Sequence, residues 1–552
     1  MSKYCNFLAA VCTVAAAVGQ SNHKISGGFE SNAQFYINDK QLNVTQPENP
    51  LRSNNYFLLN YQYKNFTAGI QAEGYENEAL LNFNPKYNQT NVATYFVQYK
   101  NKFVDATLGY FYEQFGSGLL YRSWEDRALG INNALMGGRV VVRPVNSLAI
   151  KGIYGRQRTG FELSEGTVFG GDLEWSVDDL LKWESSGLSF GLTYIGRDEL
   201  TGFENPNFNR TTNGYGVRSN FNFGKFYGGL EYNYKSPDGV VEASGQVQNL
   251  FVKQGTAALL NLGYASKGFG IDGTFRRLEN FSFFSERAAK GNVFNDRILN
   301  FIPSLTKQHH FNLANIYVYQ SQPNVILSDQ TLVKAGEIGG QIDLFYEFSK
   351  GSLLGGKYGT KVALNMSNWH ALAGDFFILP PKDYDTNILG FGKKYFSDYN
   401  IEISKKFNNK FQGIFGYINQ YYNKKLIEET EGLVRTNIVA AEGTYRFTTK
   451  QSTRVLLEHM WADGDRKNWA SATVEYNVNQ QLSFYVMDLY NYGSDDELQQ
   501  KHYYNFGTAF RKKSTRIAFS YGRQRGGLVC VGGVCRFVPE STGFSLSLNT
   551  AF

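Results

Sequence analysis

The amino-acid sequence predicts an all-β fold, a transmembrane antiparallel β-barrel of about 24 strands, in a range of roughly 22 to 26. Three observations predict this fold. Aromatic residues make up 16% of the chain, which has 57 Gly but only 11 Pro. A strand–turn–strand unit recurs along the sequence. Short polar turns also alternate with long polar loops along the chain. Outer-membrane barrels have this pattern, with short turns on the periplasmic side and long loops on the extracellular side.

The composition fits a barrel better than several soluble domains. Mean hydropathy is −0.36, a value usual for soluble proteins, despite the many aromatic residues. In a membrane barrel only alternate residues face lipid and the others face a wet lumen, so the two features occur together. The formal net charge of +6 is small for 552 residues. It therefore gives no reason to expect nucleic acid as a partner.

The N-terminus has the pattern of a signal peptide over residues 1–19. A lysine precedes the apolar run Phe7–Val18, and small residues mark a cleavage site near Gly19. The sequence around Cys12 weakly resembles a lipoprotein box, but the apolar run continues beyond it. We therefore expect residues 20–552 to form a single barrel domain in the bacterial outer membrane.

The first hairpin illustrates the recurring unit. Leu59, Tyr61 and Tyr63 share one face, Asn60 and Gln62 lie on the other, and the chain turns directly afterwards. This period of two is typical of a strand with one apolar and one polar face.

About eleven such hairpins, with a first and a last strand, give the expected strand count. The expected turns lie at Lys64-Asn65, Lys100-Asn101, Pro144–Ser147, Gly224-Lys225, Ser266–Gly268, Lys350, Asn408-Asn409, Lys450-Gln451, Asn479–Gln481 and Lys512-Lys513, with a weaker one at Trp183–Gly187. The expected long loops include 39–53, 201–213, 370–397 and 423–434.

The last strand is amphipathic and ends on an aromatic residue. Phe544, Leu546, Leu548 and Phe552 share one face. Such an ending resembles the C-terminal signal that the barrel-insertion machinery reads, which favours the outer membrane.

Two segments are candidates for loops that fold into the lumen. The segment 285–337 is the longest interruption of the hairpin rhythm and is too apolar for a loop in water, although one more strand pair is an open alternative. The second segment follows Phe115–Gly118. Its charged residues are pore-constriction candidates, because rings of charge line many pores, and a self-paired surface loop is the alternative. These candidates are Arg122, Glu125, Asp126 and Arg127.

The stretch YGRQR occurs at Tyr154–Arg158 and again at Tyr521–Arg525. Both copies lie late on strands that rise from short turns, so each Tyr is expected in the upper aromatic girdle. With unbroken alternation the arginines face outward and bind lipopolysaccharide phosphates. A bulge at Gly155 or Gly522 would instead turn them into the lumen, and a solvated strand extension is a third possibility. The arginines concerned are Arg156, Arg158, Arg523 and Arg525.

Cys530 and Cys535 are expected to form a disulfide. Gly532-Gly533 fits a two-residue turn with positive φ, which Val531 and Val534 close as a hydrogen-bonded pair. Cys530 and Cys535 then lie opposite each other at the next rung, a non-hydrogen-bonded pair. The envelope is oxidising, and a pair of reactive thiols is the alternative.

The sequence contains no recognisable catalytic or metal motif. It has six His and lacks GxSxG, HExxH and Walker patterns, and His309-His310 has no partner at ligand spacing. We expect no enzymatic activity, no cofactor and no metal. Strand pattern begins by about Lys24, which leaves no room for the plug domain of an active importer.

Three stretches, at 112–138, 353–365 and 525–539, resemble a family of large porin-like outer-membrane β-barrels of Bacteroidota whose function is unknown. The resemblance runs over most of the chain after the signal peptide. It implies the fold and the location, but no activity.

Two functions of different classes remain open. The first is a passive channel for small hydrophilic solutes, with inserted loops as the filter. The second is a non-conducting scaffold or subunit of an envelope secretion or assembly complex, with other envelope proteins as partners. In both cases the protein contacts outer-membrane lipid and lipopolysaccharide.

Overall fold

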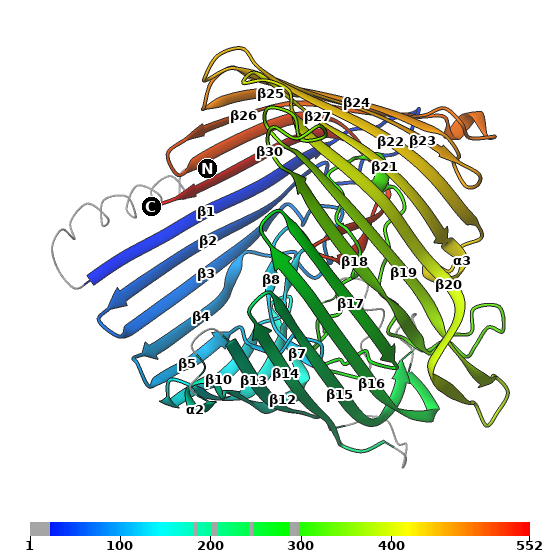
Figure 1. The fold of residues 1–552 in the computed structure, drawn as a ribbon. Helices are drawn as coiled ribbons and strands as arrows, with labels where there is room; N and C mark the ends of the chain where they lie inside the picture. Colours follow the sequence, from blue (N-terminus) through cyan, green and yellow to red (C-terminus); the bar gives the residue numbers. More distant parts are fainter. Residues whose placement is uncertain are drawn as a thin grey trace.

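A computed structural model describes residues 23–181, 183, 186–200, 208–241, 247–287, 295 and 297–552. Twenty-four strands form one antiparallel sheet in which neighbours along the chain pair with each other. The first strand, β1, pairs with the last, β30, so the sheet closes into a barrel (Figure 1). The predicted fold class and strand count are confirmed. The predicted signal peptide at 1–19 lies outside the described residues.

The strands of the barrel and the short elements of its loops have the following bounds. The barrel strands are β1 (His23–Tyr36), β2 (Leu51–Tyr63), β3 (Phe66–Glu76), β4 (Asn91–Lys100), β5 (Val104–Phe111), β10 (Leu135–Val145), β11 (Leu148–Thr159), β12 (Glu162–Ser176), β13 (Ser186–Asp198), β14 (Thr211–Phe223), β15 (Phe226–Val241), β16 (Val247–Ser266), β17 (Phe269–Glu279), β18 (Gly336–Phe348), β19 (Thr360–Phe377), β20 (Asp383–Lys406), β21 (Phe411–Asn423), β22 (Leu433–Arg446), β23 (Ser452–Ala462), β24 (Trp469–Asn477), β25 (Leu482–Asn491), β26 (His502–Lys512), β27 (Thr515–Gln524) and β30 (Ser541–Ala551). The loops contain β6 (Gln114–Phe115), β7 (Tyr121–Arg122), β8 (Glu125–Asp126), β9 (Ile131–Asn132), α2 (Asp178–Leu181), η1 (Leu313–Asn315), α3 (Lys424–Ile427), η2 (Glu497–Gln499), β28 (Gly527–Val531) and β29 (Val534–Val538).

Alternation along the strands produces an apolar outer face and a polar inner one. On β30, Phe544 and Leu546 are exposed on the outside, whereas the intervening Ser545 and Ser547 line an internal cavity. An outward apolar belt of this kind, with aromatic residues towards both ends of the strands, is the surface that lipid covers in outer-membrane barrels. The chain is therefore an outer-membrane type of barrel.

The short turns lie where the sequence predicts them, but one predicted loop is wrong. Residues 370–397 belong mainly to β19 and β20, which form a tall hairpin with a short connection. The register between these strands shifts three times, next to Trp369, His370 and Leu372. Each shift breaks the alternation by which a strand is recognised in sequence, so the segment resembles a loop.

The hydrophobic core of the molecule lies inside the barrel, between its wall and two loops. The first loop, residues 112–134, joins β5 to β10, and the second loop, residues 280–335, joins β17 to β18. Apolar side chains of the second loop pack on the buried Trp369 and Trp469 of the wall, and those of the first loop pack on the opposite side of the lumen. Among its described residues, the second loop adds no strand to the barrel.

Candidate functional site in the barrel lumen

The first loop is anchored to the wall through its FGSG turn. The backbone N–H of Ser117 donates to Glu231 of β15 at 3.0 Å. At the start of the loop, Glu113 accepts hydrogen bonds from Arg139 at 2.6 Å and from Lys151 at 3.3 Å. Because these partners lie on β10, β11 and β15, the loop crosses the lumen rather than standing above the membrane.

The structure brings two of the four pore-constriction candidates together on the wall. Arg127 pairs with Glu30 of β1 at 3.0 Å and with Glu125 at 3.2 Å. Glu125 also accepts a hydrogen bond from Gln71 of β3 at 2.7 Å. Arg127 and Glu125 therefore pair with each other and with side chains of the wall strands. These contacts hold the first loop against the wall.

The other two candidates have local roles. Asp126 accepts a hydrogen bond from the backbone N–H of Leu129 at 3.0 Å, inside the loop. The guanidinium of Arg122 lies 4.0 Å from the ring centre of Phe301, which belongs to the second loop. Arg122 therefore joins the two loops by a cation–π contact.

The second loop is held by polar and apolar contacts with the wall. Glu458 accepts hydrogen bonds from the side chain of Asn312 at 2.9 Å and from the backbone N–H of Leu313 at 3.1 Å. Phe311 lies against Gly416, where a Cβ atom would come within 2.5 Å of the ring. Only glycine at 416 leaves room for this ring, so wall and loop are fitted to each other.

The adjacent histidines also hold the second loop. The Nε2 atom of buried His309 lies 2.9 Å from a carboxylate oxygen of Asp398 on β20. The ring of His310 lies near Glu402 and Glu442, and burial is the main cause that lowers the pKa of His310. Within the described ranges, no group of three or more His, Cys, Asp or Glu side chains is arranged to hold a metal ion.

The two cysteines lie in the hairpin β28–β29. Cys530 and Cys535 are directly opposite each other, and their sulfur atoms lie at disulfide distance, 1.89 Å. Gly532 and Gly533 form the turn with φ angles of +57° and +82°, a conformation that favours glycine. The hairpin therefore has the glycine turn and the opposed cysteines that the sequence predicts.

The sequence did not reveal where this hairpin packs. The backbone N–H of Ser304 in the second loop donates to the carbonyl of Gly533 at 2.8 Å. The guanidinium of Arg536 donates to the carbonyl of Ala128 in the first loop at 2.6 Å. The hairpin thus bridges the two lumen loops, and no local signal in the sequence carries this information.

The first YGRQR copy divides between the two faces of the wall. Tyr154 is 64% exposed on the outer face, and Arg156 is exposed on the same side. Arg158 is fully buried and pairs with Glu73 of β3 at 2.7 Å. The register between β11 and β12 shifts between the two arginines, which turns Arg158 inward. The prediction of lipid contact is therefore wrong for Arg158, and the bulge lies beyond Gly155.

In the second copy neither arginine is free to meet lipid. Arg523 is buried and pairs with both carboxylate oxygens of Asp39, at 2.7 and 3.0 Å, because the loop between β1 and β2 covers it. Arg525 lies beyond the end of β27 and donates to the carbonyl of Asn315 in the second loop at 3.3 Å. The predicted lipid contact is wrong for both, since the strand ends and a loop covers them.

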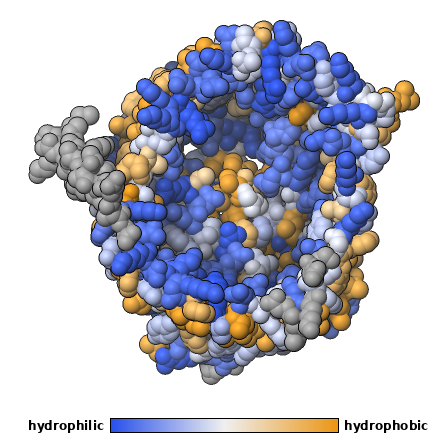
Figure 2. Space-filling view, turned by 60° about the vertical axis from the view of Figure 1, so that its left-hand side comes forward, coloured by the Kyte–Doolittle hydropathy of each residue, from blue (hydrophilic) through white to orange (hydrophobic). Residues whose placement is uncertain are grey.

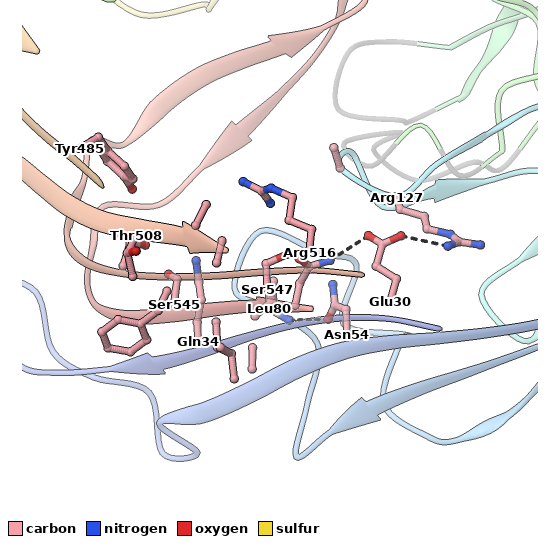
Figure 3. A pocket seen from close by; sticks show the side chains of 18 of the residues that line it. Glu30, Gln34, Asn54, Leu80, Arg127, Tyr485, Thr508, Arg516, Ser545 and Ser547 are labelled. Atoms are coloured by element: carbon pink, nitrogen blue, oxygen red, sulfur yellow. Dashed lines mark hydrogen bonds and ion pairs between the residues drawn. The ribbon is translucent and has the colours of Figure 1, made fainter. Parts of the chain in front are cut away.

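A cavity of about 590 Å³ lies between the first loop and the strands around the closing seam of the barrel. Figure 3 shows its polar side chains, which come from the first loop and from β1, β2, β25, β26, β27 and β30. They include Glu30, Gln34, Asn54, Arg127, Tyr485, Thr508, Arg516, Ser545 and Ser547. Of these, Arg127 was a constriction candidate from the sequence. Ser545 and Ser547 alternate with the apolar face predicted for the last strand.

Small inward side chains keep this side of the lumen open. Ala518 and Ser520 of β27 line the cavity together with the two serines of β30. A second cavity, of about 290 Å³, shares Gln34 and Ser545 and continues towards Arg525. Figure 2 shows a hollowed face of the molecule with a mainly hydrophilic wall. Open space with polar side chains on its wall therefore follows the seam.

Comparisons with solved structures find other large barrels at low identity. The P pilus usher (PapC) translocation pore is 9% identical, with 96% of this chain and 99% of that chain covered and a TM-score of 0.40. A BenF-like porin from Pseudomonas fluorescens Pf-5 is 8% identical, with 81% and 96% covered and a TM-score of 0.34. The siderophore receptor PirA from Pseudomonas aeruginosa is 8% identical, with 97% and 81% covered and a TM-score of 0.40.

No curated protein matches the chain. No helix among the described residues has the length and hydropathy to cross a membrane. A family model matches residues 1–552, and the chain therefore belongs to DUF6029, a family of unknown function.

Proposed function

We propose that the protein is a passive channel for small hydrophilic solutes, with a path along the seam of the barrel. The observation that carries the proposal is the cavity of about 590 Å³ lined by hydroxyl and amide side chains. A barrel of 24 strands is wider than the 16–18-stranded porins that already conduct, so its loops must narrow it. The two lumen loops supply that narrowing.

The loops are built as a fixed filter. Their apolar side chains pack on the wall, and ion pairs such as Arg127–Glu30 hold the first loop against it. Arg127, which lines the cavity and pairs with Glu125, borders the path and forms its constriction. Solutes that carry hydroxyl groups find partners along the seam in Gln34 and Ser545.

A matched pair of substitutions tests the path. Ser545→Trp places an indole into the cavity, whereas Ile517→Trp changes a residue of β27 that is exposed on the outer face and is not among the residues that line the cavity. Conductance of the purified protein in planar bilayers is expected to fall strongly in the first variant and to stay unchanged in the second. Equal conductance of both variants, in folded barrels, would contradict a path along the seam.

A non-conducting scaffold of an envelope complex is the second candidate. The observation that favours it is the hairpin β28–β29, which bridges the two lumen loops. A wild-type barrel without conductance that co-purifies with stoichiometric partners would support this function instead.

A further inference from the structure

Two arginines face each other on neighbouring strands at the short-turn end of the barrel. Arg511 of β26 and Arg516 of β27 are directly opposite in the antiparallel register. Residues opposite each other lie on the same face of a sheet. Arg516 lines the seam cavity, as Figure 3 shows, so both arginines belong to the inner face.

This pair carries uncompensated positive charge. Like charges directly opposite each other destabilise a strand pair. The carboxylates that line the cavity already have partners, since Glu30 pairs with Arg127 at 3.0 Å and Glu475 pairs with Arg454 at 2.8 Å. Within the part of the chain that the structure describes, neither Arg511 nor Arg516 has an ion pair. Both side chains are exposed, and Arg516 lines the cavity.

We propose that Arg511 and Arg516 bind small oxyanionic solutes, which carry a carboxylate, phosphate or sulfate group, at the periplasmic entrance of the seam cavity. A guanidinium offers parallel N–H donors that match the two oxygens of such a group. Two guanidinium groups on adjacent strands therefore form a clamp for one anion. The hydroxyl and amide groups of Ser545, Ser547 and Gln34, farther along the cavity, receive the uncharged part of the solute.

This inference names the solute class of the proposed channel and rests on that function. Fixed charge at a pore entrance raises the local concentration of counter-ions and repels co-ions over about a Debye length of 10 Å. The channel is therefore expected to be anion-selective. Removing both charges removes the source of that selectivity.

Reversal potentials in planar bilayers under a potassium chloride gradient test the inference. The wild-type barrel is expected to favour chloride, and the variant Arg511→Gln/Arg516→Gln should lower the chloride-to-potassium permeability ratio by roughly twofold or more. The matched control is Lys512→Gln/Lys513→Gln, which removes the same charge from the end of β26 and the turn that follows it. An unchanged ratio in the arginine variant, or equal changes in both variants, would overturn the inference.

A binding measurement separates this inference from the proposed function. The fluorescent trisulfonate pyranine is titrated into the detergent-solubilised barrel, which requires no conduction. Binding that weakens about tenfold in the arginine variant, but not in the lysine control, supports the anion site even if the wild-type barrel never conducts. Absence of pyranine binding to the wild-type protein, together with the absence of chloride preference, would refute it.

Discussion

The guanidinium of Arg158 on β11 donates to the carboxylate of Glu73 on β3 at 2.7 Å, inside the barrel and with both side chains buried. Three strands, β4, β5 and β10, separate these two in the sheet. The hydroxyl of Tyr75 also donates to Glu73, at 2.8 Å. The pair therefore ties together parts of the wall that do not pair as strands.

Removing one partner of this pair is expected to destabilise the barrel. Arg158→Met leaves a buried carboxylate without its cation, which costs about 3–5 kcal/mol in the free energy of unfolding. The double variant Arg158→Met/Glu73→Leu should recover most of that loss, because neither charge remains. The free energies of unfolding of the single and the double variant are measured by urea denaturation. The heat-dependent mobility of the folded barrel in gels serves as the signal. Arg156→Met, at the exposed neighbour, is the control and should change little.

Arg156 is the one YGRQR arginine left on the outer face, and we propose that it contacts lipopolysaccharide phosphate. Its Nε atom donates to the carbonyl of Ser164 at 2.6 Å, which leaves the other donors of the guanidinium for an anion. Arg156→Gln should reduce co-purifying lipopolysaccharide by roughly fivefold for a contact worth ~1 kcal/mol. Arg516→Gln should leave the lipid content unchanged. Equal lipid in the wild type and in Arg156→Gln would refute the contact.

The predicted disulfide is tested best in the unfolded protein, because Cys535 is buried and would resist labelling in either redox state. We expect no maleimide labelling of Cys530 or Cys535 in sodium dodecyl sulfate without reductant, and labelling of both after reduction. Acid quenching before denaturation prevents later oxidation. Labelling of both cysteines without reductant would show two free thiols.

Lys334 gives the barrel a pH-dependent stability. Its Nζ atom donates to Gln322 at 2.7 Å and to the carbonyl of Leu426 at 2.8 Å, and burial lowers its pKa from 10.5 to about 8. Between these two values the unfolded chain holds a proton that the folded protein has lost. The free energy of unfolding should therefore rise by about 3 kcal/mol from pH 8 to pH 10.5. Below pH 8 the buried ammonium group of Lys334 is charged in the folded protein, and its full destabilising effect is present.

A substitution isolates this contribution from other groups that titrate at high pH. The difference in urea midpoint between wild type and Lys334→Met should be largest below pH 8, in favour of the variant, and should shrink as pH rises. A difference that stays constant over this range would show that Lys334 keeps its ordinary pKa in the fold.

The sequence by itself determined the barrel, its strand count and its turns. These depend on local physics: a period of two places Phe544 and Leu546 outside and Ser545 inside, and the φ angles of a tight turn select residues such as Gly532 and Gly533. Such signals are complete within a few residues, so they can be read without knowing the rest of the chain. The strands in the segment 370–397 were not predicted, because register shifts interrupt the period of two along it.

Only the tertiary structure decided what fills the lumen. The partners Glu73 and Arg158, or Asp39 and Arg523, are far apart in sequence, and no periodicity links them. Arg511 and Arg516 face each other and are close in sequence. Whether a carboxylate lies near enough to pair with them depends on the other residues around the cavity, which come from distant parts of the chain. Charge pairing and packing depend on distances in space, which closure of the barrel sets. The sequence therefore indicated which segments could enter the lumen, but their contacts, the seam cavity and its facing arginines became visible only in the folded chain.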